Sequence, residues 1–272
     1  MSKYIYHYTT IDTLALILEN KTLRLNSLAN VDDMEEGQAG EFRDMSKYIF
    51  VSSWTKDIEE NIPLWKMYTP DMAGVRIGID SAKIKLEKNN NNNVINIDSS
   101  NEILAFQNGL FFDDVKYDDT PISLFDSNGK ITRETLAKLG KQKSKKWEFQ
   151  KEARFVLMGL RKELVEDDTF FPSCIQLETR FFELCLHKPS LELSENNGFS
   201  SLTHYFLTSQ LNISYIDLKL SEEVWNNIEI ILGPKTTPDN QDRVQSLVKK
   251  YVPSDLNPQI KKSSLKIRYS NS

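Results

Sequence analysis

The alternation of apolar and polar positions predicts a strand at the start of the chain and a helix directly after it. In residues 4–8 every second side chain is a tyrosine, so three aromatic rings share one face of a strand and His7 lies on the other. Thr10 fits the N-cap of a helix over 11–20, because apolar residues there recur at helical spacing. The chain therefore opens with a strand followed by a helix.

Short apolar runs and helical spacing predict the remaining elements in the same way. Strands are expected at 23–25, 48–54, 74–80, 153–158, 174–177, 181–186, 213–218, 228–232 and 265–269. Helices are expected at 62–68, 132–150 and 240–251. Strands outnumber helices, do not alternate regularly with them and form no internal repeat. This order predicts an α+β fold rather than a doubly wound parallel sheet.

Two segments lack apolar periodicity. Residues 30–36 are acidic and are expected to form a loop or the first turn of a helix. The five asparagines at 89–93 have no apolar surface to bury and indicate a solvated loop. Neither segment resembles an interdomain linker, so residues 1–272 are expected to form a single domain.

The composition adds limits to this fold. Of the 272 residues 39% are hydrophobic and 27% are charged, which is typical of a folded, water-soluble protein. No apolar run reaches the roughly 18 residues that a membrane helix needs, and the N-terminus does not resemble a secretory signal. A cytoplasmic protein without membrane contact is expected. The net charge of −5 argues against non-specific coating of nucleic acid but leaves a local basic groove open.

Common metal and nucleotide sites have no support in the sequence. The cysteines, Cys174 and Cys185, are too far apart for a Cys-x-x-Cys motif. The histidines, His7, His187 and His204, lack the i, i+4 spacing of a zinc helix. No Gly-x-Gly-x-x-Gly, phosphate-binding loop or Gly-x-Ser-x-Gly is present. We therefore expect no metal cofactor and no hydrolase triad.

Candidate chemistry gathers in three polar motifs that each lie at the end of a predicted strand. They are His-Tyr-Thr at 7–9, Ser-Ser-Trp at 52–54 and Gln-Lys-Glu-Ala-Arg at 150–154. Polar groups at strand ends are common, so each motif alone has a structural explanation. The order of the three motifs is what indicates a shared site.

This order of motifs resembles the ADP-ribosyltransferase superfamily. It is also similar to a bacterial family of unknown function, with an N-terminal His-Tyr-Thr, a middle Ser-x-Trp, a late Glu-x-Glu-x-Arg and a near-terminal Ile-Ile-x-Gly-Pro, here at 230–234. The second similarity extends over most of the chain. The resemblance implies two packed, mostly antiparallel sheets that form an NAD cleft flanked by helices.

On the NAD side the resemblance implies cofactor-binding roles for the first two motifs. His7 would hold a ribose of NAD, Tyr8 would lie near the nicotinamide or the adenine, and Thr9 would line the same site. Ser52 or Ser53 would orient the catalytic carboxylate with a charge-assisted hydrogen bond. NAD is then a substrate, and no metal is implied.

On the catalytic side the resemblance makes Glu152 the catalytic carboxylate. Gln150 matches the position that engages the acceptor, although the family of unknown function more often has glutamate there. Arg154 shares a strand face with Glu152, so it could bind a pyrophosphate or neutralise Glu152. Breaking the nicotinamide–ribose bond passes through an oxocarbenium-like state, which a carboxylate stabilises.

Each of these residues also has a purely structural explanation. His7 could be a half-buried strand histidine bonded to a backbone carbonyl, and Glu152 with Arg154 could be a surface ion pair. The acidic segment at 32–36 could supply a second carboxylate, although such runs usually form solvated surface.

Two basic stretches suggest a nucleic acid, with RNA favoured, as the acceptor of ADP-ribose. Their members are Lys138, Lys141, Lys143, Lys145, Lys146 and Lys151 in the first, and Lys261, Lys262, Lys266 and Arg268 in the second. If both flank one cleft they could bind a phosphate backbone. The first stretch could instead be the solvated face of a helix.

The sequence thus predicts an NAD-dependent mono-ADP-ribosyltransferase, a bacterial toxin or anti-phage defence effector that releases nicotinamide and is held in check by an antitoxin or inhibitor protein. Three alternatives stay open. They are an NAD glycohydrolase, a protein-directed ADP-ribosyltransferase, and a non-enzymatic interaction module with Trp54, Trp65 and Trp147 as anchors.

Overall fold

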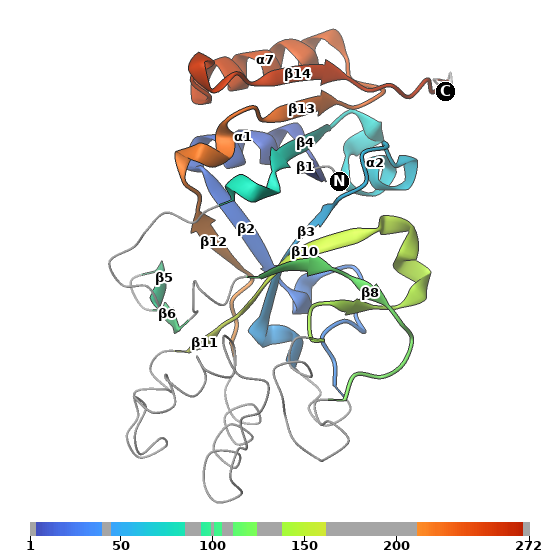
Figure 1. Ribbon diagram of the computed structural model, residues 1–272, viewed down its shortest axis with the longest axis vertical. Helices are drawn as coiled ribbons and strands as arrows, with labels where there is room; N and C mark the ends of the chain where they lie inside the picture. The colour runs from blue at the N-terminus through green and yellow to red at the C-terminus, as the bar shows by residue number, and fades with distance from the viewer. Residues whose placement is uncertain are drawn as a thin grey trace, which may run out of the picture.

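The computed structural model describes residues 4–39, 45–84, 94–98, 101–104, 111–123, 138–161 and 211–268. These residues form an α+β architecture, with a large mixed sheet, two small sheets and a few helices (Figure 1). The fold class predicted from the sequence is therefore confirmed. The predicted strands at 174–177 and 181–186 and the asparagine loop at 89–93 lie outside the described residues.

The large sheet has nine strands. Seven of them lie side by side in the order β12 (Tyr215–Lys219), β2 (Thr22–Ser27), β3 (Ile49–Thr55), β1 (Tyr4–Thr9), β4 (Val75–Asp80), β13 (Glu229–Leu232) and β14 (Gln259–Lys262). β10 (Glu152–Met158) pairs with β3, and β7 (Phe111–Asp114) pairs with β10. Of these pairings only β13 with β14 is parallel.

The remaining elements are short. Two small sheets contain β5 (Val94–Asp98), β6 (Asn101–Leu104) and β11 (Leu160–Arg161), and β8 (Lys116–Tyr117) with β9 (Gln142–Lys143). The α-helices are α1 (Ile11–Asn20), α2 (Ile62–Tyr68) and α7 (Pro238–Tyr251). The 3-10 turns are η1 (Leu28–Asn30), η2 (Met45–Tyr48), η3 (Pro70–Met72), η4 (Ser81–Lys83), η6 (Lys145–Gln150), η7 (Glu222–Trp225) and η8 (Ser254–Leu256).

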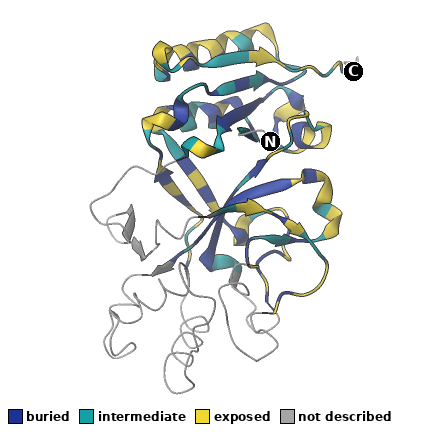
Figure 2. Ribbon diagram, in the orientation of Figure 1, coloured by how far each residue is buried: buried dark blue, intermediate teal, exposed yellow. Residues whose placement is uncertain are grey.

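Helices cover both faces of the part of the sheet that contains β1, β4 and β13. On one face, Leu14 of α1 and Val248 of α7 are buried in the main core together with Ile5 of β1. On the other face, Tyr8 of β1 meets Trp65 of α2 edge to face, with ring centroids 4.9 Å apart. Figure 2 shows the strands of this region as mostly buried and the outer side of α7 as exposed.

The start of α1 agrees with the sequence pattern. The Thr10 hydroxyl accepts a hydrogen bond from the Thr13 backbone N–H at 3.0 Å, which satisfies one of the unpaired donors of the first turn. The helix ends at Lys21, which adopts a left-handed conformation and donates its backbone N–H to the Ile17 carbonyl. The cap fixes the direction in which α1 leaves β1.

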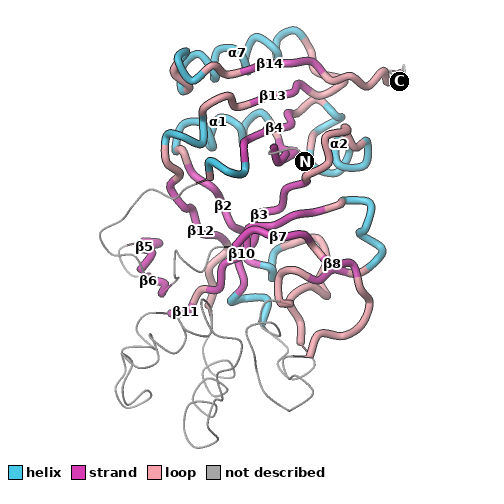
Figure 3. Tube along the Cα trace, in the orientation of Figure 1, coloured by secondary structure: helices cyan, strands magenta, loops and turns pink. Residues whose placement is uncertain are grey.

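The sheet divides at β3. Among the described strands, β1 and β3 are joined by one residue pair, Tyr6 with Thr55, whereas β10 runs along the whole opposite edge of β3. On the edge shared by β1 and β2, only Phe50 and Val51 pair with β2. The residues at 52–54 therefore have no strand partner on this edge. β2 and β3 are paired at one end only and separate beyond it, as the tube in Figure 3 shows, so the sheet forms two halves.

Most predicted elements are confirmed with shifts of one or two residues at their ends. The strand at 265–269 is an exception, because β14 lies earlier and residues 265–268 are irregular. The two packed sheets implied by the resemblance are also absent from the described residues, where one divided sheet takes their place. The expectation of a single domain over 1–272 stays a prediction.

The helix predicted over 132–150 is wrong in its second half. Gly140 has a φ of 79°, and the following residues form β9, which pairs with β8. Ser144 then caps η6, and Lys151 ends it in a left-handed conformation. Gly140 disfavours a continuous helix here, since glycine is a poor helix former. The lysines of this stretch therefore do not share one helical face.

Candidate functional site

A cavity of about 470 Å³ opens where the sheet divides. It is lined by all eight residues that the sequence singled out, from β1, β3, η6 and β10. Three segments that are far apart in the chain thus meet at one place. Residues of α1, β2 and α2, and the loop after η1, complete the wall.

Glu152 lies at the start of β10, in the wall of this cavity, and is 8% exposed. Its Oε2 accepts hydrogen bonds from Arg154 Nε at 2.5 Å and from Ser53 Oγ at 3.5 Å, and its Oε1 accepts one from Lys143 Nζ at 3.3 Å. Burial raises the pKa of Glu152, but the charges of Arg154 and Lys143 outweigh burial and hold this pKa below its ordinary value. The carboxylate is therefore ionised at neutral pH.

Arg154 holds the Glu152 carboxylate in place by hydrogen bonds. All N–H donors of its guanidinium group are engaged, so none is left for a pyrophosphate. Its Nη1 donates to Glu36 Oε2 at 3.0 Å and to the Gly140 carbonyl at 3.3 Å, and its Nη2 donates to Glu36 Oε1 at 3.0 Å and contacts Glu152 Oε2 at 2.5 Å. With Nε on Glu152, all five N–H donors face protein acceptors. The cofactor-binding role expected for Arg154 stays a prediction. The alternative of a surface ion pair is wrong, because Glu152 and Arg154 are both buried.

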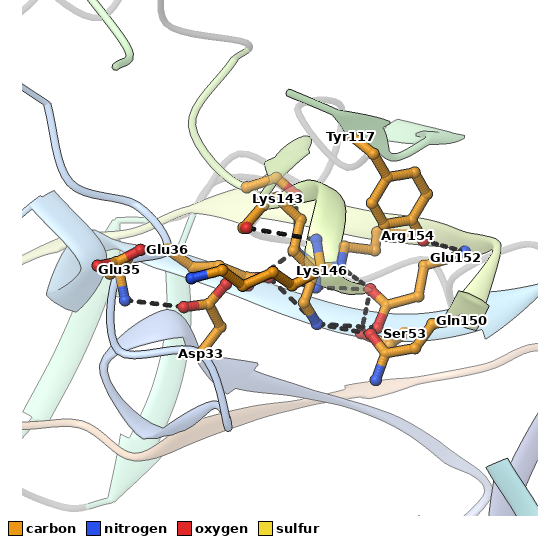
Figure 4. A network of polar contacts seen from close by, with 12 residues as sticks. Asp33, Glu35, Glu36, Ser53, Tyr117, Lys143, Lys146, Gln150, Glu152 and Arg154 are labelled. Carbon is orange, nitrogen blue, oxygen red and sulfur yellow. Dashed lines mark hydrogen bonds and ion pairs between the residues drawn. The ribbon is translucent and has the colours of Figure 1, made fainter. Parts of the chain in front are cut away.

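Glu36 and Lys143 complete a buried cluster of two carboxylates and two cations (Figure 4). The Lys143 ammonium contacts Glu36 Oε1 at 3.2 Å, in addition to Glu152 and Gln150. The side chains of Glu36 and Lys143 are 1% and 3% exposed. The charges balance within the cluster, which is what makes burial of four ionised groups tolerable.

Gln150 is fully buried, and both ends of its amide are already bonded. Its Oε1 accepts from Lys143 Nζ at 2.7 Å, and its Nε2 donates to the Tyr68 hydroxyl at 2.8 Å. That Gln150 engages an acceptor stays a prediction; Gln150 lines the cavity, with its amide bonded to Lys143 and Tyr68. Its role is to position Lys143 and Tyr68.

His7 occupies the gap on the edge of β3. Its Nδ1 lies 2.8 Å from the Ser53 carbonyl, which can only accept, so Nδ1 carries the hydrogen. Burial lowers the pKa of His7, although the bond to Ser53 opposes this effect. The ring is therefore neutral at pH 7, and Nε2 is an acceptor. The ring also packs on Trp54, with centroids 5.2 Å apart.

The two serines of β3 have different partners. Ser53 contacts Glu152 through its hydroxyl and His7 through its carbonyl, so it links the two predicted site residues. The Ser52 hydroxyl instead accepts from Trp54 Nε1 at 3.1 Å. Of the two candidates for orienting the carboxylate, the structure places Ser53 at Glu152 and Ser52 at Trp54.

Tyr8 and Thr9 line the cavity, but Tyr8 is anchored toward α2. Its hydroxyl accepts from the Asn61 backbone N–H at 2.9 Å, and its ring packs against Trp65. Tyr8 is 5% exposed and Thr9 is 6% exposed. The side chain of Tyr8 therefore belongs mainly to the small core under α2.

The first basic stretch is partly neutralised. Lys143 is buried, Lys141 bonds Asp113 at 2.7 Å and Lys151 bonds Asp57 at 2.8 Å. The exposed lysines of this stretch that have no carboxylate partner among the described residues are Lys138, Lys145 and Lys146.

The interaction-module alternative needs exposed tryptophans as anchors. Trp54 and Trp65 are only 8% and 0% exposed.

Residues 64–155 match the model of one protein family. That family is described as "Protein of unknown function (DUF2971)". The matched segment is about a third of the chain and runs from α2 into β10, so it contains Tyr68, Lys143, Gln150, Glu152 and Arg154. A similarity to a family of unknown function is thus confirmed for this segment. No curated protein and no solved structure gives a match.

The sequence offered Glu36 only as one of four acids that could supply a second carboxylate, and Lys143 only as one of six lysines in a basic stretch; it did not single out Tyr68. Burial against Arg154 and Lys143 distinguishes Glu36 from the other acids of its segment. Lys143 belongs to a run of lysines, and Tyr68 to an amphipathic helix. Tyr68 and Lys143 lie within the matched segment 64–155, whereas Glu36 lies outside it.

No group of three or more histidine, cysteine, aspartate or glutamate side chains in the part of the chain that the structure describes could hold a metal ion. None of the helices found there is long and apolar enough to cross a membrane.

Proposed function

We propose that this protein is an NAD-dependent mono-ADP-ribosyltransferase that breaks the nicotinamide–ribose bond and passes ADP-ribose to an acceptor. The observation that carries the proposal is Glu152, a buried but ionised carboxylate in the wall of a cavity of about 470 Å³. This volume lies within the range of small-molecule and cofactor pockets. An anion fixed in a poorly solvated wall stabilises positive charge that develops on a bound sugar.

Glu152 has the acceptor capacity that this role needs. Three donors, two on Arg154 and one on Ser53, meet Oε2, whereas only Lys143 meets Oε1. A carboxylate oxygen has two lone pairs, so Oε1 can accept a further hydrogen bond from a ribose hydroxyl. The cations fix the carboxylate in place without using this position.

His7 supplies a second contact for a ribose. With Nδ1 bonded to Ser53, the neutral ring presents Nε2 as an acceptor for a hydroxyl group. The contact expected for His7 is therefore acceptance of a hydrogen bond rather than donation. Ser53 joins His7 to Glu152, so both groups would bind the same sugar or its neighbour.

The acceptor we propose is a nucleic acid, with RNA favoured. η6 and the C-terminal segment both contact the residues just before α2, since Asn61 bonds the Phe149 carbonyl and Glu60 bonds Ser263 and Ser264. Exposed basic residues lie on both, namely Lys145, Lys146, Lys262, Lys266 and Arg268. The Trp147 and Phe149 rings lie 6.2 Å apart, and Phe149 is 39% exposed. Aromatic rings beside cations bind single-stranded bases by stacking.

Modification of cellular RNA harms the cell that makes the enzyme. The proposed biological role is therefore a bacterial toxin or anti-phage defence effector that an antitoxin or inhibitor protein restrains. The test is co-purification of the intact chain with a specific inhibitor that abolishes its activity.

The enzyme is tested by incubating the purified chain with NAD labelled in the adenylate half, together with RNA, DNA and protein in separate reactions. We expect nicotinamide release and label on RNA, and a loss of about 10²–10³-fold in the Glu152→Gln variant. Glu222→Gln is the matched control, because Glu222 is exposed and does not line the cavity. Circular dichroism and NAD-binding measurements show whether the variants are folded.

Outcomes of this experiment separate the alternatives. Label on protein alone would replace the nucleic-acid acceptor with a protein acceptor. The proposed enzymatic activity would be overturned if no mixture released nicotinamide, or if a folded Glu152→Gln variant released it undiminished.

An NAD glycohydrolase is the second candidate, and one observation favours it. The amide of Gln150 is bonded at both ends, so the position that the superfamily uses to engage a macromolecular acceptor is occupied. Water could then reach the sugar more easily than a large acceptor. Free ADP-ribose formed at the same rate with and without RNA would select this function.

A further inference from the structure

The proposed function assigns His7 and Glu152 to the ribose and assigns no group to the proton that the acceptor loses. The general base inferred here rests on that function. The attacking group of an acceptor carries a hydrogen that must leave as the new bond forms. Gln150 is buried and bonded at both ends, and an amide is not a base. Glu152 is a poor base, because Arg154 and Lys143 hold its pKa low.

A different carboxylate lines the same cavity without the cations that surround Glu152. Asp32, in the loop after η1, lines the cavity and is exposed. It makes no hydrogen bond or ion pair with any residue that the structure describes, whereas its neighbours are engaged: Asp33 caps the Glu35 backbone N–H at 3.1 Å and Glu36 binds Arg154. Asp32 is therefore a cavity-lining carboxylate that is not neutralised by a cation of the described chain.

Tyr68 lines the same cavity as Asp32 and Glu152. Its hydroxyl accepts from Gln150, so the hydroxyl hydrogen is left to point elsewhere. Burial raises the pKa of Tyr68, and the charges of Glu152 and then Asp32 raise it further, so the phenol lies within the field of both carboxylates. Tyr68 is thus a neutral hydroxyl donor in the cavity that Glu152 and Asp32 also line.

We infer that Asp32 is the general base that takes the proton from the acceptor, while Glu152 stabilises the sugar. The C1′–N bond of NAD breaks, and its electron pair goes to the nicotinamide nitrogen, which becomes neutral. A lone pair of the acceptor atom forms the new bond to C1′, and the proton of that atom passes to the Asp32 carboxylate. Acceptors that carry a proton on the attacking atom are the class that this geometry serves.

Asp32→Ala separates this role from the rest of the mechanism. We expect nicotinamide release with water or RNA as acceptor to fall by about 10²–10⁴-fold, the usual contribution of a general base. NAD binding should stay within about twofold, because Glu152, Ser53 and His7 are untouched. Azide, an anion with no proton to lose, should restore nicotinamide release in Asp32→Ala and give ADP-ribosyl azide.

Controls make the result decisive. Glu35→Ala removes an exposed acid of the same loop that does not line the cavity, and should behave as the unchanged chain does. Asp32→Asn tests the charge with less change of shape, and should lose activity without rescue by azide if the amide blocks the site.

Two results would overturn the inference while leaving the proposed function in place. They are release within about threefold of the unchanged chain in Asp32→Ala, or a slow Asp32→Ala variant that binds NAD but gives no azide adduct. If the unchanged chain releases no nicotinamide at all, the proposed function fails and the role of Asp32 fails with it. The two failures are thus distinguishable.

Discussion

At the residue scale, contacts with Arg154 and Lys143 keep the buried Glu152 carboxylate ionised. Arg154 uses five N–H donors and Lys143 contacts three acceptors, so neither cation depends on water. This arrangement requires Glu36, which balances the second positive charge. A carboxylate outside the cavity therefore determines whether the carboxylate inside it can stay ionised and in place.

Glu36→Gln should destabilise the fold strongly. The substitution leaves Arg154 and Lys143 facing one carboxylate instead of two, and breaking a buried pair from one side costs about 3–5 kcal/mol. Urea denaturation followed by circular dichroism measures the change in the free energy of unfolding.

Glu35→Gln, one residue earlier, is the control for Glu36→Gln. Glu35 is exposed, so its substitution should change stability by no more than about 0.5 kcal/mol. Equal effects of the two substitutions would show that the buried cluster does not stabilise the molecule.

His7 predicts a pH dependence of stability. Its pKa in the folded chain is lower than the ordinary value of 6.5, so the unfolded chain binds a proton more readily. The contribution of His7 is present above pH 6.5 and is lost as the pH falls through the folded-state pKa. We expect His7→Gln to reduce this loss.

The measurement is the free energy of unfolding of both chains between pH 7.5 and 5, compared at each pH. Taking the difference between the two chains cancels the titration of the other histidines. Parallel profiles would mean that His7 does not titrate differently in the folded state.

The positions of reactive residues were predictable, but their partners were not. The polar motifs that contain His7, Ser53 and Glu152 could be read from the sequence, and the structure brings them together from β1, β3 and β10 in the wall of one cavity. The link between Glu36 and Arg154 joins residues 118 positions apart, and no periodicity records it. The hydrogen bonds that the Gln150 amide makes with Lys143 and Tyr68 were missed for the same reason.

At the element scale, strong patterns gave correct elements and a charge-rich pattern did not. α1 and β1 have a clear apolar period and a cap, and both were predicted. The stretch over 132–150 has many helix formers but few apolar residues, so tertiary contacts decide its structure. Pairing with β8 and burial of Lys143 turn its second half into β9 and η6.

Thr10→Ala tests the cap that follows β1. Loss of the hydroxyl removes the bond to the Thr13 N–H and should destabilise the fold by about 1 kcal/mol. Thr10→Ser keeps the bonding oxygen and should stay close to the unchanged chain. Thermal unfolding of the three chains gives the comparison. A Thr10→Ser variant as unstable as Thr10→Ala would show that the methyl group, not the cap, matters.

At the scale of the whole molecule, the divided sheet explains where the cavity lies. β1 and β3 share one pair of residues, and the two halves of the sheet separate beyond it. The sequence predicts the α+β class and most strands of both halves. It does not predict the division, because strand order depends on pairings such as β4 with β13 that link residues about 150 positions apart.

A ligand that contacts both halves should stabilise the whole molecule. A non-cleavable NAD analogue at about 100 times its dissociation constant contributes about 2.7 kcal/mol, which corresponds to a rise in Tm on the order of 5–10 °C. Differential scanning fluorimetry measures the shift. AMP, which reaches only part of the cavity, should give a smaller rise at equal concentration. No shift with the analogue would contradict binding of NAD in the folded state.

The central position of β1 in the sheet also sets the earliest time at which the sheet can be complete. β1 is made first by the ribosome, yet its neighbours β3 and β4 come later, and β13 and β14 close the sheet near residue 262. At 5–20 residues per second, translation reaches that point after roughly 10–50 s. The cavity walls that β1, β3 and β4 supply therefore belong to a sheet that cannot be complete before this interval has passed.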